Sequence, residues 1–295
     1  MASVAYGAQV RARRRPLSRR LGAAGPFTYL FLLVVAVVSA FPLYWSLVVA
    51  SHDNSAVAAY PPVLTPGHQL WHNLHRLFDS GEVNVDFWTA LANSALVASV
   101  VTAAVVFFSA LAGFAFAKLR FRGRRALLLA VIGTMLVPVQ LGVIPLYIEM
   151  VHFGWANHLQ AVIAPNLASA FGVFLMRQYI VGSVPDELID AARVDGCYTL
   201  GVFWHVILPA VRPVAAVLGL LTFMTTWNDF FWPLVVLSPR NPTVQVAVST
   251  LASGYVEDYA LVLTGTFVSI LPLLFVFVVL GRHIISGIMQ GAVKA

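Results

Sequence analysis

Six long apolar segments constrain what this chain can fold into. Each has the length of about 20 residues that an α-helix needs to cross the hydrocarbon core of a bilayer. The apolar residues are continuous rather than alternating, which favours transmembrane helices over the strands of a membrane barrel. The predicted spans are Phe27–Ala50, Phe87–Ala117, Ala126–Tyr147, Leu159–Ile180, Val214–Val236 and Tyr259–Leu280. The sequence therefore predicts an all-α integral membrane protein with six transmembrane helices.

The composition excludes a water-soluble fold. Hydrophobic residues make up 60% of the 295 residues and charged residues only 10%, whereas soluble domains carry about 25% charged residues. The mean hydropathy is +0.84. Length alone would suggest about two soluble domains, but this composition indicates one bundle buried in lipid. Cys197 is the only cysteine in the sequence, so no intrachain disulfide can form.

The basic residues predict the orientation of the spans. If the N-terminus lies in the cytoplasm, every Lys and Arg except Arg76 and Arg240 falls in a cytoplasmic segment. This asymmetry is what the positive-inside rule requires, so both termini are expected inside (N-in, C-in). Residues 1–26 then form a basic cytoplasmic tail, and residues 27–295 form the transmembrane domain. A basic tail can also bind nucleic acid, but beside an apolar span it is first a topology signal, and no nucleic-acid partner is expected.

The first apolar segment also has features of a signal peptide. It follows a basic flank and contains Val38-Ser39-Ala40, which is similar to a cleavage site. Its apolar run continues for 24 residues, which is too long for the h-region of a signal peptide. We therefore expect a retained transmembrane helix.

The cytoplasmic segment between the fourth and fifth predicted spans, residues 184–209, begins with the signals of a short helix. Ser183 is a possible N-cap, because its side chain can accept a hydrogen bond from the first turn. Asp186 and Glu187 would then face the positive end of the helix dipole. Gly196 can adopt the left-handed conformation that ends a helix.

A second short helix is predicted to follow. Thr199 can cap its start, and Leu200, Phe203 and Ile207 recur at helical spacing, so they share one face. An apolar face flanked by charge suits docking into a groove on a soluble partner. An amphipathic helix of this kind can also rest on lipid headgroups. The pattern itself leaves both interpretations open.

The same segment resembles the EAA loop of binding-protein-dependent ABC importer permeases. The family pattern is Glu-Ala-Ala, two residues, Asp-Gly-Ala, and further on an aliphatic residue before Leu-Pro. This chain has Asp190-Ala191-Ala192, Asp195-Gly196-Cys197 and Ile207-Leu208-Pro209. It departs from the pattern at Asp190, where the family has glutamate, and at Cys197, where it has alanine. Both changes are small and are compatible with the helix–turn–helix.

The resemblance covers most of the chain. Phe114–Phe121, Trp227–Phe230 and the ending Gly291–Ala295 are similar to the six-span maltose-type and glycerol-phosphate-type permease subunits. The resemblance implies an ATP-driven importer subunit of a bacterial inner membrane. Such a subunit forms half of the pathway for a sugar, an oligosaccharide or a glycerol-phosphate-like solute.

The resemblance also implies the partners. These are a dimer of ATP-binding cassette subunits that hold ATP and Mg, a second homologous permease subunit, a solute-binding protein and membrane lipid. The chain itself is expected to be no enzyme and to carry no cofactor, and its sequence contains no Gly-rich phosphate loop ending in Lys-Ser or Lys-Thr. The resemblance assigns coupling to the ATPase to Asp190, Ala191, Ala192, Asp195, Gly196, Leu200, Phe203, Ile207, Leu208 and Pro209.

Trp227, Asn228 and Asp229 are candidate solute-pathway residues. A carboxylate within a span is a functional candidate by default, and aromatic and amide groups suit sugars through stacking and hydrogen bonds. Alternatively, Asp229 lies near the outer end of the span or bonds to another helix. No metal site is expected, because His68, His72 and His75 have helical spacing without supporting carboxylates or cysteines.

Two other classes of function compete with an ATP-driven importer. An ion-coupled secondary transporter normally has several charges within its spans and discontinuous helices in repeated halves, whereas Asp229 is nearly alone here. A membrane scaffold without transport would not depend on an ATPase partner. A secondary transporter would also leave the EAA-like pattern of residues 184–209 unexplained.

Overall fold

The computed structural model describes residues 25–57, 60–79, 85–253 and 258–292, with the side chains of 280 and 282–292 excepted. Every regular element in these ranges is a helix, as predicted. The chain divides into two units, residues 1–45 and 46–295. Most of α1 (Pro26–Ala50) belongs to the first unit. The arginines of the predicted basic tail lie outside the described residues.

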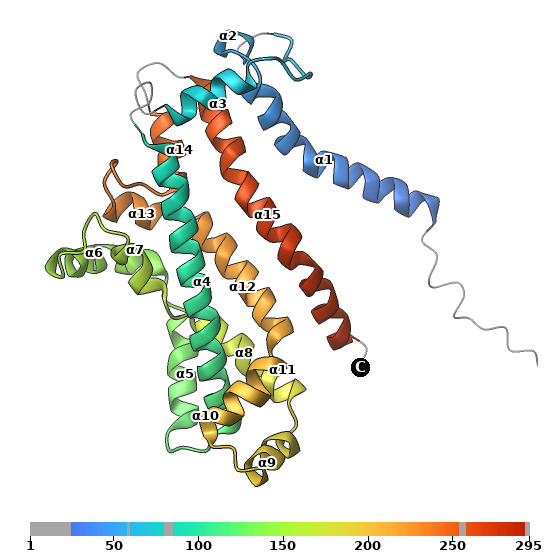
Figure 1. The fold of residues 1–295 in the computed structure, drawn as a ribbon, viewed down its shortest axis with the longest axis vertical. Helices are drawn as coiled ribbons and strands as arrows, with labels where there is room; N and C mark the ends of the chain where they lie inside the picture. The colour runs from blue at the N-terminus through green and yellow to red at the C-terminus, as the bar shows by residue number, and fades with distance from the viewer. Residues whose placement is uncertain (1–24, 58–59, 80–84, 254–257, 293–295) are drawn as a thin grey trace, which may run out of the picture. The chain divides into compact units, whose positions relative to one another are not determined.

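The second unit is built around four long helices (Figure 1). These are α4 (Phe87–Lys118), α8 (Ala170–Ser183), α12 (Arg212–Trp227) and α15 (Tyr259–Ala292). Helix α4 packs against α8 and α12, and α12 packs against α15. With 32 residues, α4 is about 48 Å long. Because a bilayer core is about 30 Å thick, the ends of α4 reach beyond the hydrocarbon.

Small residues allow α4 and α8 to approach closely. A Cβ atom added at Gly113 would lie 2.7 Å from Cβ of Met176 and 2.9 Å from the backbone nitrogen of Arg177. A Cβ atom added at Gly172 would overlap the hydroxyl oxygen of Ser109. The two helices therefore pack backbone against backbone, as small-residue faces permit in membrane bundles.

The third predicted span, Ala126–Tyr147, is broken rather than continuous. Helix α5 (Arg124–Thr134) is followed by the 3-10 turn η2 (Val139–Gly142) and by α6 (Val143–His152). The bend between the two arms is 88°. Pro138 precedes η2. Because proline lacks an amide hydrogen and restricts the residue before it, it favours an interruption of the helix at this position.

The fourth and fifth predicted spans, Leu159–Ile180 and Val214–Val236, are also interrupted. The fourth consists of α7 (Gln160–Ile163), the 3-10 turn η3 (Ala164–Asn166) and α8, and the fifth of α12 and α13 (Phe231–Val236). The first break contains Pro165 and leads to Ser169, whose hydroxyl caps α8 by accepting from the amide of Gly172. Apolar composition predicted these helices but not their interruptions.

The described residues contain between three and six candidate membrane spans. Three single helices are long and apolar enough to cross a membrane: Pro26–Ala50, Phe87–Lys118 and Tyr259–Val279. The helices that qualify only as bent pairs are Arg124–Thr134 with Val139–His152, Gln160–Ser183 with Asp186–Val194 (81°), and Thr199–Ala210 with Arg212–Trp227 (76°).

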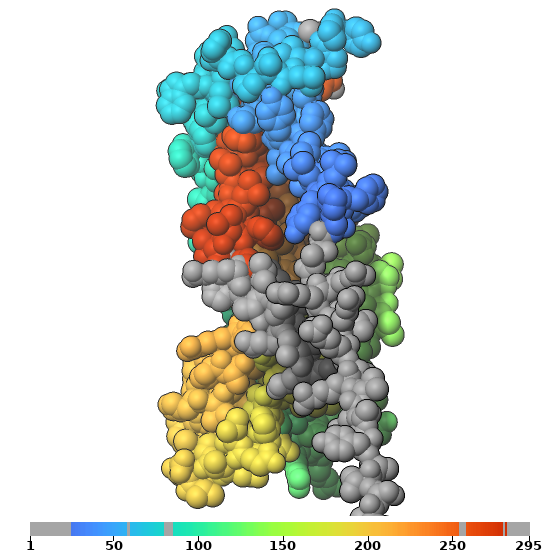
Figure 2. All heavy atoms as spheres, turned by 90° about the vertical axis from the view of Figure 1, so that its right-hand side faces the viewer, coloured from blue at the N-terminus to red at the C-terminus, as the bar shows by residue number. Residues whose placement is uncertain are grey.

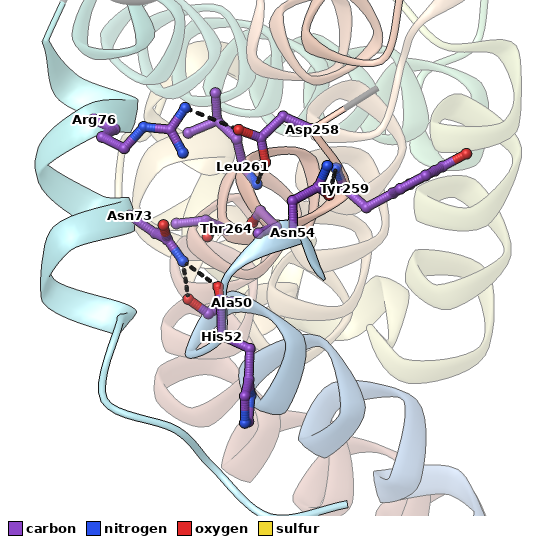
Figure 3. A network of polar contacts seen from close by, with 10 residues as sticks. Ala50, His52, Asn54, Asn73, Arg76, Asp258, Tyr259, Leu261 and Thr264 are labelled. Carbon is purple, nitrogen blue, oxygen red and sulfur yellow. Dashed lines mark hydrogen bonds and ion pairs between the residues drawn. The ribbon is translucent and has the colours of Figure 1, made fainter. Parts of the chain in front are cut away.

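A short helix, α14 (Val244–Leu251), precedes α15. The segment between the first two predicted spans, residues 51–86, contains α2 (Asn54–Val57) and α3 (Leu70–Phe78) in its described part. Polar contacts fasten the segment to the start of α15 (Figure 3). The guanidinium of Arg76 pairs with Asp258 at 2.8 Å, and the amide of Tyr259 donates to the side-chain oxygen of Asn54 at 2.9 Å. The side-chain amide of Asn73 donates to the carbonyl oxygens of Ala50 and His52. This segment is therefore packed against the start of α15 within the second unit.

Candidate functional site

The predicted helix–turn–helix lies at the end of the second unit where α4 finishes (Figure 1). Its first helix, α9 (Asp186–Val194), carries Asp186 and Glu187 in its first turn, as predicted. Ser183 is not its N-cap, because this residue is still the last residue of α8 and Pro185 stands at the cap position.

The turn after α9 follows the prediction at Gly196, which has a φ of +84°. This left-handed conformation is one that glycine adopts without a steric cost. The next helix starts directly at Thr199, so Thr199 is a helical residue, and Tyr198 occupies the cap position without a side-chain hydrogen bond. The prediction of Thr199 as a cap is therefore wrong.

The second helix is continuous but changes its pitch. It consists of α10 (Thr199–Val202), the π-helical turn η4 (Phe203–Ile207) and α11 (Leu208–Ala210). Pro209 has no amide hydrogen to donate to the preceding turn, and the π turn lies immediately before it. Such π turns are frequent at functional sites.

The apolar face predicted for the second helix points mainly into the protein. Phe203 and Ile207 are 1% and 0% exposed, whereas Leu200 is 54% exposed. The ring of Phe203 packs between Phe107 and Phe114 of α4, at centroid distances of 6.2 and 6.1 Å. Phe203 and Ile207 therefore anchor the helix to α4, and they form no docking surface in this conformation.

The exposed surface of this segment combines apolar and acidic side chains. Val194 is 87% exposed, and Leu188, Tyr198 and Leu200 are also exposed. Among the residues assigned to coupling from the sequence, those exposed are Asp190, Ala191, Asp195, Gly196, Leu200 and Pro209; Leu208 is half-buried, and Ala192, Phe203 and Ile207 are buried.

Lys118, the last residue of α4, fastens the start of α9. Its side chain is only 9% exposed, and its ammonium donates to the carbonyl oxygen of Val184 at 2.6 Å and to the carboxylate of Asp186 at 2.5 Å. The hydrogen bond from Lys118, followed by the attraction of its charge, holds the pKa of Asp186 below its usual value of 3.8. Sequence reasoning missed this contact, because the two residues are 68 positions apart and only the fold brings them together.

The three candidate pathway residues do not form one site. Trp227 is 2% exposed, its indole nitrogen donates to the carbonyl oxygen of Ser269 at 3.0 Å, and its ring stacks on Phe223. Trp227 is therefore a core residue, closed to solute in this conformation. Asn228 is exposed and its side-chain amide donates to the carbonyl oxygen of Met224 at the end of α12. Asp229 is half-buried in the break between α12 and α13.

A polar groove of about 470 Å³ lies one to two turns before Trp227. It is bounded by the middle of α4, by the break before α8 and by α12. The groove takes its name from its polar lining residues, which are Asn166, Ser169, Thr222, Thr225 and Thr226. The rest of the lining is apolar (Val101, Val105, Ala168, Phe171, Leu218 and Leu221), and the lining includes no ionisable side chain. Irregular backbone at membrane depth is tolerated where it lines a cavity. The helix break at residues 167–169 lines this groove, which accounts for a non-helical segment at this position.

No metal centre accompanies these sites in the part of the chain that the structure describes. Within it, no three His, Cys, Asp or Glu residues are grouped so that they could hold a metal ion. The segment 184–209 and the polar groove are therefore the candidate sites.

Comparison with known proteins identifies related chains. Residues 106–289 match the family described as "Binding-protein-dependent transport system inner membrane component". The lactose transport system permease protein of Rhizobium radiobacter is 34% identical, with 90% of this chain and 95% of the relative covered. The arabinooligosaccharides transport system permease protein of Halalkalibacterium halodurans is 31% identical, with coverage of 88% and 93%.

Two further matches extend this comparison. The sn-glycerol-3-phosphate transport system permease protein of Yersinia pestis is 29% identical, with 90% of this chain and 95% of the relative covered. The crystal structure of a bacterial ABC transporter that imports alginate contains a chain with a TM-score of 0.74 at 23% identity, with coverage of 87% and 94%. This likeness shows a shared fold.

Proposed function

The chain belongs to the family of binding-protein-dependent transport system inner membrane components, and from this membership we propose that it is the permease subunit of an ATP-driven sugar or oligosaccharide importer. It crosses the cell's inner membrane with both termini in the cytoplasm and forms half of the solute pathway. The full count of six spans and this orientation are part of the proposal, which places segment 184–209 outside the membrane.

The observation that carries the proposal is the attachment of segment 184–209 to α4. Three side-chain contacts join them: the ammonium of Lys118 at the start of α9, the ring of Phe203 between two phenylalanines of α4, and the ring of Trp204 beside Phe107. The segment also forms an exposed end of the second unit, coloured yellow to gold in Figure 2. A force applied to this end by a partner would therefore move α4 with it.

The partner that applies this force is a dimer of ATP-binding cassette subunits, which carries ATP and Mg. Closure of that dimer swings the attached helices as rigid bodies between inward-open and outward-open states. A solute-binding protein delivers the solute at the outer face, and a second homologous permease subunit supplies the other half of the pathway. The chain itself hydrolyses no ATP.

The polar groove indicates the class of solute. Its lining offers one amide and four hydroxyl side chains among six apolar residues, with no charge. Neutral hydroxyl and amide groups match the hydroxyls of a sugar, whereas a phosphate ester would require a cationic partner to offset its desolvation. The groove therefore favours a neutral polyhydroxylated solute over a glycerol phosphate.

Reconstitution into liposomes tests the proposed function. The assembly purified from its native membrane should take up a neutral oligosaccharide only with ATP inside and the solute-binding protein outside. Uptake driven by an ion gradient without ATP would instead assign the chain to the secondary transporters. A protein that retains no ATP-binding subunit and moves no solute would be a scaffold.

Thr225→Val tests the groove. The hydroxyl of Thr225 is exposed and donates to the carbonyl oxygen of Leu221 at 3.0 Å, which leaves its oxygen able to accept from a solute. Loss of one neutral hydrogen bond costs about 0.5–1.5 kcal/mol, so the KM for uptake should rise by about 2- to 10-fold. Thr250→Val is the matched control, because Thr250 makes the same backbone contact in α14 outside the groove. Equal KM values for the two variants would show that Thr225 does not contact the solute.

A further inference from the structure

A second cavity lies at the cytoplasmic end of the proposed topology, beside α9. It has a volume of about 790 Å³ and is enclosed by the turn between α4 and α5 on one side and by α9 on the other. We call it the basic notch, after its charged lining residues Lys118, Arg120, Arg124, Asp186, Asp190 and Arg193. The sequence pattern of the coupling segment does not include the α4–α5 turn.

The charges of the basic notch do not balance within the chain. Lys118 is paired with Asp186 at 2.5 Å, and Arg193 lies 4.0 Å from Asp190 on the exposed side of α9. Four cations therefore face two carboxylates, and the positive excess lies on the side of the notch that carries Arg120 and Arg124.

One of these two arginines is fixed in place. The guanidinium of Arg124 donates to the carbonyl oxygen of Leu119 at 3.0 Å across the α4–α5 turn. This bond uses one of the five N–H donors of the side chain. A guanidinium that is already oriented loses less side-chain entropy when it binds a carboxylate, and it can bind one with two parallel hydrogen bonds.

The exposed face of α9 has the opposite charge. Outside the notch lining, Glu187 on α9 and Asp195 directly after it are exposed, while Arg193 is offset by Asp190. A partner that covers both surfaces must therefore present a basic region to α9 and an acidic group to the notch. Opposite charges at neighbouring positions fix the register of an interface, because a shifted partner would bring like charges together.

We infer that the basic notch receives an acidic side chain of the ATP-binding subunit, so that the α4–α5 turn is a second docking point beside α9. This inference rests on the proposed function. The notch opens beside the helix that the ATP-binding subunit would engage, and its lining is mainly polar, which suits a water-soluble protein. The second docking point would transmit force to α4 and α5 together.

Arg120→Glu is the direct test, with Arg122→Glu as its matched control. Both residues lie in the same exposed turn and both variants change the net charge equally, but only Arg120 lines the notch. The complete assembly should be purified from membranes and its bound ATP-binding subunit quantified over a series of salt concentrations. We expect Arg120→Glu to weaken retention of that subunit about tenfold at about 0.15 M salt, and Arg122→Glu to leave it unchanged.

Three other outcomes would overturn the inference. Equal losses in the two variants would show a general effect of net charge. Full retention in both variants would exclude an acidic group at the notch. Full retention together with loss of bound anionic phospholipid in Arg120→Glu would assign the notch to a lipid headgroup. Arg120→Gln, which removes the charge without reversing it, should give an intermediate loss, and unchanged melting temperatures exclude misfolding. A wild-type assembly without any ATP-binding subunit would instead contradict the proposed function itself.

Discussion

Lys118→Met is expected to lower ATP-driven uptake at least about tenfold, which corresponds to a coupling free energy of ~1.4 kcal/mol. Methionine keeps the apolar stem of the side chain and removes the ammonium that holds both the carbonyl oxygen of Val184 and the carboxylate of Asp186. The start of α9 then loses its connection to α4. ATP-driven movement of α9 would no longer be passed to the bundle.

The decisive measurement is the ratio of solute transported to ATP hydrolysed. Uncoupling predicts that hydrolysis continues while uptake falls, whereas loss of the partner would stop both. Arg122→Met, in the nearby turn outside the notch, should leave the ratio unchanged. A Lys118→Met variant with the wild-type ratio would show that this contact transmits nothing.

The same contact predicts a pH dependence. A carboxylate whose pKa is lowered by folding contributes stability above its unfolded pKa and loses this contribution as the pH falls through the folded value. The pKa of Asp186 is lowered from 3.8 by the hydrogen bond from Lys118. The ion pair between Lys118 of α4 and Asp186 of α9 should therefore stay charged throughout the range of about pH 5–8.

Local signals predicted the elements of the fold well. The apolar run that begins at Phe87 predicts α4 to within one residue, and the break at Gly196 was predicted because few residues other than glycine adopt a positive φ. In both cases the physical cause acts within a few residues of the position that it determines.

Features that depend on neighbours in space were not predictable in this way. Helical spacing placed Phe203 and Ile207 on one face, but periodicity does not say whether that face meets a partner or the chain's own α4. Trp227 was read as a pathway residue, whereas its indole donates to Ser269 in the core. The polar groove depends on a helix break that apolar composition does not reveal.

Phe203→Ala should have the largest effect on stability. Phe203 is 1% exposed and its ring contacts Phe107 and Phe114 of α4. Truncation leaves a cavity between the second helix and α4, and the cost of replacing a buried phenylalanine by alanine is about 3 kcal/mol or more. Since the same ring attaches the segment to the bundle, uptake per ATP hydrolysed should also fall.

Trp204→Ala separates anchoring from the loss of aromatic surface. Trp204 is the next residue in the same π turn and has the larger side chain. Its ring also contacts Phe107 of α4, at a centroid distance of 6.1 Å, but the residue is 51% exposed. If burial against α4 is the cause, Trp204→Ala should lower the unfolding midpoint by less than half of the shift caused by Phe203→Ala. Equal shifts would mean that the exposed ring matters as much as the buried one. The two substituted residues are adjacent in the chain. A difference between their shifts in unfolding midpoint therefore reports which face of the second helix packs against α4, and the sequence pattern did not determine this face.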